Sequence, residues 1–137
     1  MNEINLSKIK SFERSISESK VIAIIPHSNP DGDAIGSTLG LCRVLENMGK
    51  DVVMISPTHF PEFLKWMPGA KKIKILGEKT KSDTDIFLNV DLLIGVDFNA
   101  LNRISNIADR FSESKANKIL IDHHPDPENF TNLLFSD

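Results

Sequence analysis

Three short segments hold the side chains in this sequence that are best suited to chemistry. They are HSNPDGDAIGS (27–37), IGVDFN (94–99) and IDHHPD (121–126). Their imidazoles and carboxylates suit manganese, zinc or iron, and the excess of carboxylates favours a hard ion such as manganese. A carboxylate shared by two ions can bridge them at ~3.5–4 Å, an arrangement that clamps a phosphoryl group and generates a hydroxide. Together the segments predict a two-metal site that hydrolyses a phosphoester.

The first segment presents His27, Asp31 and Asp33 in the pattern H-x3-D-x-D. Pro30 stiffens the backbone between them, and Gly32 permits the tight turn that lets two carboxylates converge. A helix that we expect to begin near Asp33 would offer free amides and partial positive charge to a phosphate oxygen. The alternative is that the aspartates only form a turn and a helix cap, and that His27 is a structural histidine.

The other two segments follow apolar runs that are typical of buried strands. Asp97 ends such a run, where a carboxylate is costly unless it is paired or bound to metal, and its central position makes it the candidate bridge. The alternative is that Asp97 only caps the next helix. His123 and His124 directly follow Asp122, and adjacent side chains of an extended segment point in opposite directions. One histidine could therefore ligate metal while the other reaches toward substrate, unless the pair occurs by chance.

The elements that must position these residues are strands alternating with helices. The predicted strands are VIAIIP (21–26), DVVMIS (51–56), KIKIL (72–76), DLLIGV (91–96) and KILID (118–122). The predicted helices cover residues 4–19, 33–49 and 99–113, with a short helix or turn in 60–70 and a polar span in 77–85. This order predicts an α/β fold, a parallel β-sheet with helices on both faces. Binding groups gather beyond the carboxyl ends of such strands, so all three polar segments should meet at one edge.

Composition limits the class of protein and of partner. The chain has 137 residues, which is one domain or a piece of one, with 40% hydrophobic and 26% charged residues. It has neither the apolar stretch of a secretory signal nor a run long enough to span a bilayer, and its single cysteine, Cys42, suits a reducing cytoplasm. We therefore expect a cytoplasmic protein. The net charge of −3 argues against a long nucleic acid as partner, so a nucleic-acid substrate should be short.

The run Asp122-His123-His124 resembles the motif after which the DHH phosphoesterase family is named. The resemblance extends from about Val21 to the end of the chain, and HSNPDGDAIGS is similar to the first motif of the nanoRNase/pAp-phosphatase branch. Manganese-dependent inorganic pyrophosphatases of the same superfamily typically carry threonine and serine where this chain has Gly32 and Ala34. Single-strand DNA exonucleases of the family have a differently built first motif.

The resemblance implies two divalent cations, with manganese as the expected metal. It implies five metal ligands: His27, Asp31, Asp33, Asp97 and His123. By this resemblance, His27 and Asp31 would ligate one ion. Asp33 and His123 would ligate the other, and Asp97 would bridge the two.

Four further residues receive roles from the same resemblance. His124 would contact the scissile phosphate or act as an acid, and Asp122 would orient the ligating histidines, as carboxylates beside metal sites commonly do. Asn29 and Arg103 would assist in binding substrate. For Arg103 the alternative, a residue on a solvated helix surface, is favoured.

The sequence also departs from the family pattern. The first domain of the family continues past the DHH run to another strand and a further metal-binding aspartate, followed by a DHH-associated substrate domain. We expect neither part within residues 1–137, since Asp126 and Asp137 lack the context of that later ligand. On this interpretation the chain is a truncated N-terminal DHH domain that alone binds metal weakly and turns over slowly.

The function that the resemblance implies is manganese-dependent hydrolysis of short oligoribonucleotides or of 3′-phosphoadenosine 5′-phosphate (pAp). A homodimer is considered for the full-length protein. Two alternatives stay open: a manganese-dependent inorganic pyrophosphatase, and a non-catalytic module that binds metal or nucleotide.

Overall fold

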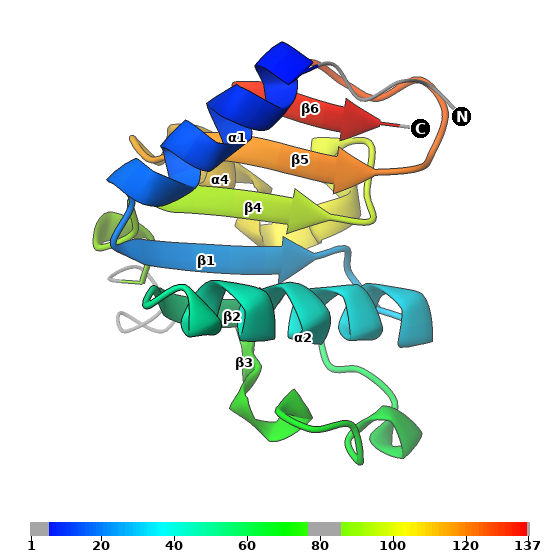
Figure 1. Cartoon of the computed structure of the whole chain (residues 1–137). Coiled ribbons are helices and arrows are strands. Elements are labelled where there is room, and N and C mark those ends of the chain that lie inside the picture. Colours follow the sequence, from blue (N-terminus) through cyan, green and yellow to red (C-terminus); the bar gives the residue numbers. More distant parts are fainter. Residues whose placement is uncertain (1–5, 77–85, 137) are drawn as a thin grey trace.

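The computed structural model describes residues 6–76 and 86–136. Its centre is a sheet of six strands in the order β3-β2-β1-β4-β5-β6, and every neighbouring pair is parallel (Figure 1). The strands are β1 (Val21–Pro26), β2 (Asp51–Ser56), β3 (Lys74–Ile75), β4 (Leu92–Val96), β5 (Asn117–Asp122) and β6 (Leu133–Ser136). The predicted parallel α/β fold is confirmed.

Helices cover both faces of this sheet. The longer ones, α1 (Leu6–Glu18) and α2 (Gly32–Asn47), lie on one face, while the 3-10 helix η3 (Leu101–Ile107) and α4 (Ala108–Glu113) lie on the other (Figure 1). Two 3-10 turns, η1 (Glu62–Leu64) and η2 (Ala70–Lys72), lie between β2 and β3. Among the described residues, no helix combines the length and apolar character needed to cross a membrane.

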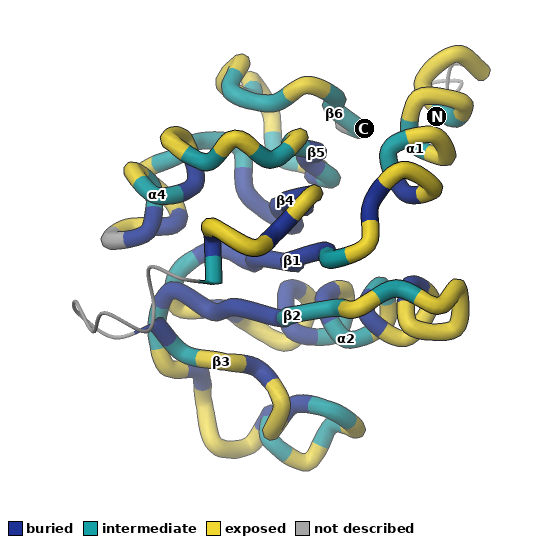
Figure 2. The backbone as a smooth tube through the Cα atoms, turned by 90° about the vertical axis from the view of Figure 1, so that its left-hand side faces the viewer, coloured by how far each residue is buried: buried dark blue, intermediate teal, exposed yellow. Residues whose placement is uncertain are grey.

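The central strands are buried because both of their faces carry apolar side chains. In β1, Ile22 and Ile24 pack into the core under α1 and α2, while Ala23 and Ile25 pack into the core under η3 and α4. All five residues of β4 are buried as well. Figure 2 shows the buried backbone concentrated in these middle strands. A parallel strand covered on both faces requires this kind of uninterrupted apolar run.

Helix α2 begins and ends with the signals that its sequence carries. Asp31 is the N-cap, and its Oδ1 accepts the backbone N–H of Ala34 at 2.9 Å. Beyond the C-terminus, Gly49 has a φ of 84°, the left-handed conformation that commonly closes helices. Cys42 is buried on this helix, and burial raises the pKa of its thiol to about 12. The thiol therefore stays protonated and unreactive at neutral pH.

Three sequence-based predictions differ from the observed elements. The expectation that no further strand follows Asp122-His123-His124 within residues 1–137 is wrong, because Leu133–Ser136 form β6 beside β5. The single helix predicted over 99–113 is wrong, because η3 and α4 replace it and Ser105 has φ 47° and ψ −118°. The third strand is shorter than predicted, with residues 74–75 only. The predicted polar span 77–85 lies outside the described residues.

Strand register determines which polar residues meet. Pro26 of β1 is level with Val96 of β4, and Val96 is level with Ile121 of β5. The residues that come next along the chain are His27 after Pro26, Asp97 after Val96 and Asp122 after Ile121. Adjacent strands are ~4.8 Å apart, so these three residues form one row across the carboxyl edge of the sheet.

Asp91 ties β1 to β4 at the opposite edge. Its Oδ2 accepts the backbone N–H groups of both Lys20 and Val21 at 2.9 Å. Both bonds lower the pKa of the Asp91 carboxyl below its ordinary value, and the bond from Val21 has the larger effect. A carboxylate held in this way stabilises the fold only while it is ionised.

We expect Asp91→Asn to lower the free energy of unfolding at pH 7, with a smaller loss in acid. Because the pKa is lower in the folded state, the stabilisation is complete above the ordinary aspartate pKa of ~3.9 and disappears as pH falls through the folded-state pKa. Urea denaturation of both proteins at pH 7 and near pH 3 measures the difference. The control is Asp51→Asn, an exposed carboxylate on β2 with no hydrogen bond among the described residues. A loss that is independent of pH would contradict the prediction.

Candidate metal centre

Strained backbone is concentrated at the edge where the three polar segments meet. Among the described residues, four non-glycine residues have positive φ: Asn29, Asp97, Ser105 and Asp126. All four lie in the segments that follow β1, β4 and β5. Such conformations cost ~1–3 kcal/mol each, persist only where surrounding contacts hold them, and cluster at functional sites.

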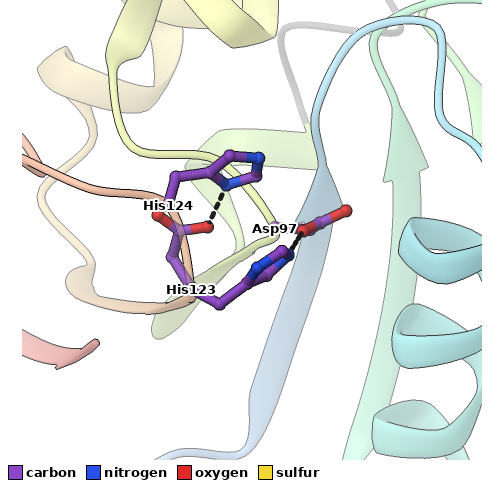
Figure 3. A group of neighbouring side chains, drawn as sticks. Asp97, His123 and His124 are labelled. Carbon is purple, nitrogen blue, oxygen red and sulfur yellow. Dashed lines mark hydrogen bonds and ion pairs between the residues drawn. The ribbon is translucent and has the colours of Figure 1, made fainter. Parts of the chain in front are cut away.

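Asp97 is the centre of a cluster of imidazoles and carboxylates. The cluster consists of His27, Asp31, Asp33, Asp97, Asp122, His123 and His124. Oδ1 of Asp97 is 2.8 Å from Nε2 of His123, and its Oδ2 is 3.4 Å from Nε2 of His27 (Figure 3 shows the first contact). The Asp97 side chain is only 8% exposed. Each oxygen of one buried carboxylate thus faces a different imidazole, as a bridge between two cations requires.

The His27 ring is oriented by its own loop. Its Nδ1 is 2.7 Å from the carbonyl oxygen of Ser28. A carbonyl only accepts hydrogen bonds, so Nδ1 donates, and in the neutral imidazole Nε2 keeps a free lone pair. Nε2 is 3.9 Å from Oδ1 of Asp31, in addition to its approach to Asp97. His27 therefore offers a ligand nitrogen to the space between two carboxylates.

Asp31 and Asp33 each approach one of the two imidazoles that face Asp97. Asp31 combines both roles considered for it, because its Oδ1 caps α2 and also lies near His27. Asp33, in the first turn of α2, has its Oδ2 3.7 Å from Nε2 of His123. The hydrogen bond to Asp97 raises the pKa of His123 above its ordinary value. A cation at this nitrogen would have to displace the proton held there.

His124 is paired with a different carboxylate. Its Nδ1 is 2.6 Å from Oδ1 of Asp122, whose side chain is completely buried. Because the carboxylate accepts, Nδ1 carries the proton and Nε2 is left for another partner. Asp122 was predicted to orient the ligating histidines; in the structure its hydrogen bond goes to His124.

The prediction that His123 and His124 point in opposite directions is wrong. Their ring centroids are 4.6 Å apart and the planes are tilted by 31°. The reason is that β5 ends at Asp122, so the alternation of an extended strand no longer applies. The two rings nevertheless have different partners, Asp97 and Asp122.

The donor set fits divalent cations. Among the described residues, two groups bring their imidazole and carboxylate ligand atoms within 4.8 Å of one another inside the group, and Asp97 belongs to both groups. One consists of His27, Asp31 and Asp97, and the other of Asp97, Asp122, His123 and His124. The predicted ligand Asp33 belongs to neither group. Oδ2 of Asp122 is buried without a hydrogen-bond partner among the described residues, a costly state for a carboxylate that a nearby cation would relieve.

Comparison with known proteins identifies the family of this chain. The model of the DHH family, N-terminal domain, matches residues 21–135. The chain belongs to the DHH family. The resemblance inferred from the motifs is thereby confirmed.

Individual relatives agree with this assignment. A stretch of 47 residues is 47% identical to the bifunctional oligoribonuclease and PAP phosphatase NrnA of Thermus thermophilus, which is 34% of this chain and 14% of that protein. An exopolyphosphatase-related protein from Bacteroides fragilis superposes with a TM-score of 0.94 and 39% identity, over 99% of this chain and 40% of that one. The exonuclease RecJ bound to manganese shares the fold, with a TM-score of 0.54 and 20% identity, over 95% of this chain and 30% of RecJ. This chain thus spans less than half of each relative.

The two predicted substrate-binding residues of this DHH domain lie at the edge of the cluster. Asn29 is exposed and hydrogen-bonded to Thr58, whose Oγ1 accepts the Asn29 backbone N–H at 2.6 Å. Arg103 is exposed on η3, and its guanidinium makes no hydrogen bond or ion pair with the described residues. Its backbone carbonyl accepts the N–H of Ser28 at 2.6 Å. The structure thus gives both residues backbone contacts beside the cluster.

A cavity of about 300 Å³ opens beside Asp97. Asp33 and His123 also line it, and Leu41, Val96 and Ile121 supply apolar walls. A small ligand group in this cavity would contact both polar and apolar side chains. Sequence reasoning gave no role to Ser28, Thr58, Ser105, Asn99 or Glu128, whose contacts hold the surrounding loops.

Proposed function

We propose that this DHH domain is the metal-binding part of a phosphoesterase that hydrolyses short oligoribonucleotides or 3′-phosphonucleotides such as pAp. The observation that carries the proposal is that Asp97 belongs to both candidate cation groups. A relative named as an oligoribonuclease and PAP phosphatase supports this choice of substrate. We propose Mn²⁺ for both cations, because carboxylates outnumber imidazoles in the donor set.

The residues divide into two roles under this proposal. His27, Asp31 and Asp97 would hold one cation, and Asp97 and His123 the other. Asp33 would join the second pair, because its Oδ2 lies 3.7 Å from Nε2 of His123. When bound, the two cations would neutralise phosphoryl oxygens and lower the pKa of the attacking water. His124 would contact the scissile phosphate or protonate the leaving oxygen through Nε2, because Asp122 holds its Nδ1.

Charge supports a short substrate. The net charge is −3, and the cluster itself contributes several carboxylates, so a phosphate would approach only when cations are bound. A long nucleic acid would gain little from such a surface. We also propose a cytoplasmic location, which the single buried cysteine favours.

The test is hydrolysis of pAp, a diribonucleotide and inorganic pyrophosphate, assayed side by side with Mn²⁺ by the intact protein that carries this chain. We expect turnover of the first two and loss of activity when EDTA removes the metal. We also expect His124→Ala to lower kcat ~10²–10⁴-fold while Mn²⁺ affinity is maintained, because the side chain is proposed to act on substrate.

The matched control is His59→Ala, an exposed histidine outside the cluster, which should retain full activity. A strong preference for pyrophosphate would replace the proposed substrate with the pyrophosphatase alternative. Mn²⁺ binding without turnover of any of the three substrates would instead favour a non-catalytic module.

A further inference from the structure

The segment that follows Asp97 is hydrogen-bonded to the loop that follows β5. The side-chain Nδ2 of Asn99 donates to the carbonyl oxygen of Pro125 at 2.9 Å. The backbone N–H of Glu128 donates to the carbonyl oxygen of Asn99 at 2.7 Å, and Oε1 of Glu128 accepts the N–H of Leu101 at 3.0 Å. Three bonds therefore join the loop of Asp97 to the loop that carries His123 and His124.

The same segment is also bonded to the loop that follows β1. The backbone N–H of Ser28 donates to the carbonyl oxygen of Arg103 at 2.6 Å, and the hydroxyls of Ser28 and Ser105 are 2.7 Å apart. Ser28 is next to His27, and its carbonyl oxygen accepts the bond from the His27 ring. The position of this imidazole is therefore connected to residue 105 through Ser28.

The backbone of the segment is in conformations that it would not keep unaided. Asp97 has φ 63°, and Ser105 has φ 47° with ψ −118°, an unusual combination for a residue with a side chain. Strain of this kind persists only where surrounding contacts hold it. The bonds on both sides of the segment are contacts of that kind.

We infer that Glu128 and Ser105 are positioning residues that set the spacing of the imidazoles around Asp97. Glu128 fixes the side of His123, and Ser105, through Ser28, fixes the side of His27. Among the described residues, no hydrogen bond or ion pair joins either of them to the candidate ligands. The inference rests on the proposed metal site, and it adds that the two halves of the site are aligned by separate sets of bonds.

The first experiment records the imidazole ¹⁵N resonances of His27 and His123 in EDTA-treated protein. We expect Glu128→Ala to shift the resonances of His123 and leave those of His27 in place. Ser105→Ala should do the reverse, because it removes only the bond to Ser28. Glu128→Gln should restore the native spectrum, since its amide oxygen can still accept the N–H of Leu101. Glu13→Ala, an exposed glutamate on α1, is the control.

The second experiment titrates Mn²⁺ and follows binding by electron paramagnetic resonance. We expect Glu128→Ala and Ser105→Ala each to weaken one of two binding steps by ~10–100-fold, the range found when a group that orients metal ligands is removed. Glu128→Gln should bind like the wild type. If Glu128→Ala does not fold, Asn99→Ala removes the bond to Pro125 and replaces it in both experiments.

Two results would overturn the inference. One is native resonances for both histidines in Glu128→Ala and Ser105→Ala. The other is equal changes on both sides together with a lower unfolding temperature, which would indicate a general structural role. The resonances are recorded without metal or substrate, so they test the inference even if the protein hydrolyses none of the proposed substrates.

Discussion

Replacing Asp97 with asparagine should lower Mn²⁺ affinity by at least ~100-fold and abolish metal-dependent hydrolysis. Loss of a group that only orients a ligand costs ~10–100-fold, so loss of a carboxylate shared by two sites should cost more. Asparagine keeps one oxygen but puts an NH₂ donor where Asp97 now faces an imidazole, and a donor cannot ligate a cation. Calorimetric titration and the substrate assay measure the two effects.

This substitution should leave the fold intact. Asparagine tolerates the left-handed conformation of residue 97 better than most residues, so the backbone with φ 63° is not newly strained. The matched control is Asp126→Asn, which makes the same change at an exposed residue with φ 51° on the same edge of the sheet, outside both candidate groups. Hydrolysis retained in Asp97→Asn would refute the metal assignment. A lower unfolding temperature in EDTA would instead attribute the loss to the fold.

Replacing Gly95 with alanine should destabilise the protein by ~1–3 kcal/mol, the usual cost of overpacking a core. A Cβ at this position would lie 2.5 Å from Cζ and 2.8 Å from Cε1 of Phe98, and 3.2 Å from Cδ1 of Leu120. Phe98 is fully buried and its ring contacts Phe111 and Phe130, so it has little room to move. Urea denaturation at neutral pH measures the loss.

A double mutant tests this explanation. Phe98→Leu removes the two ring atoms that would collide with the new Cβ, so the cost of Gly95→Ala should fall in that background, with a coupling of ~0.5–3 kcal/mol. The control is Gly40→Ala in the interior of α2, where no atom lies within 4 Å of the added Cβ. That change should stabilise the helix by ~0.5–1 kcal/mol. Additive effects of Gly95→Ala and Phe98→Leu would show that the contact is not the cause.

Gly95→Ala should also weaken Mn²⁺ binding. Phe98 directly follows Asp97, and a displaced ring would shift the backbone that holds the carboxylate. We expect the loss of affinity to recover in the double mutant together with stability. Recovery of Mn²⁺ affinity would show that the packing of Phe98 against β4 affects metal binding at the cluster.

The central strands and the grouping of the candidate ligands could be predicted from residue types alone. β1 and β4 are apolar runs with no polar face, and only burial on both sides of a sheet accommodates such runs. In a parallel sheet the carboxyl ends of the strands share one edge, so the convergence of His27, Asp97 and Asp122 followed from strand order. What each residue does there stays a prediction.

The segment 99–113 shows why local patterns failed elsewhere. Leu101, Ile104 and Ile107 are spaced three residues apart, and Phe111 follows four residues later, a pattern compatible with either a 3-10 or an α-helix. The break comes at Ser105, whose hydroxyl meets that of Ser28, 77 residues earlier in the chain. No window of sequence around residue 105 contains that partner.

The amino-acid sequence by itself therefore determined which segments are buried and which side chains could hold a cation. Only the tertiary structure decided the pairs: His123 with Asp97, His124 with Asp122, and Glu128 with the backbone of Leu101. The physical reason is that burial and backbone preference are encoded by neighbouring residues. The direction of a side chain in a loop depends instead on bonds to segments that only the folded sheet brings together.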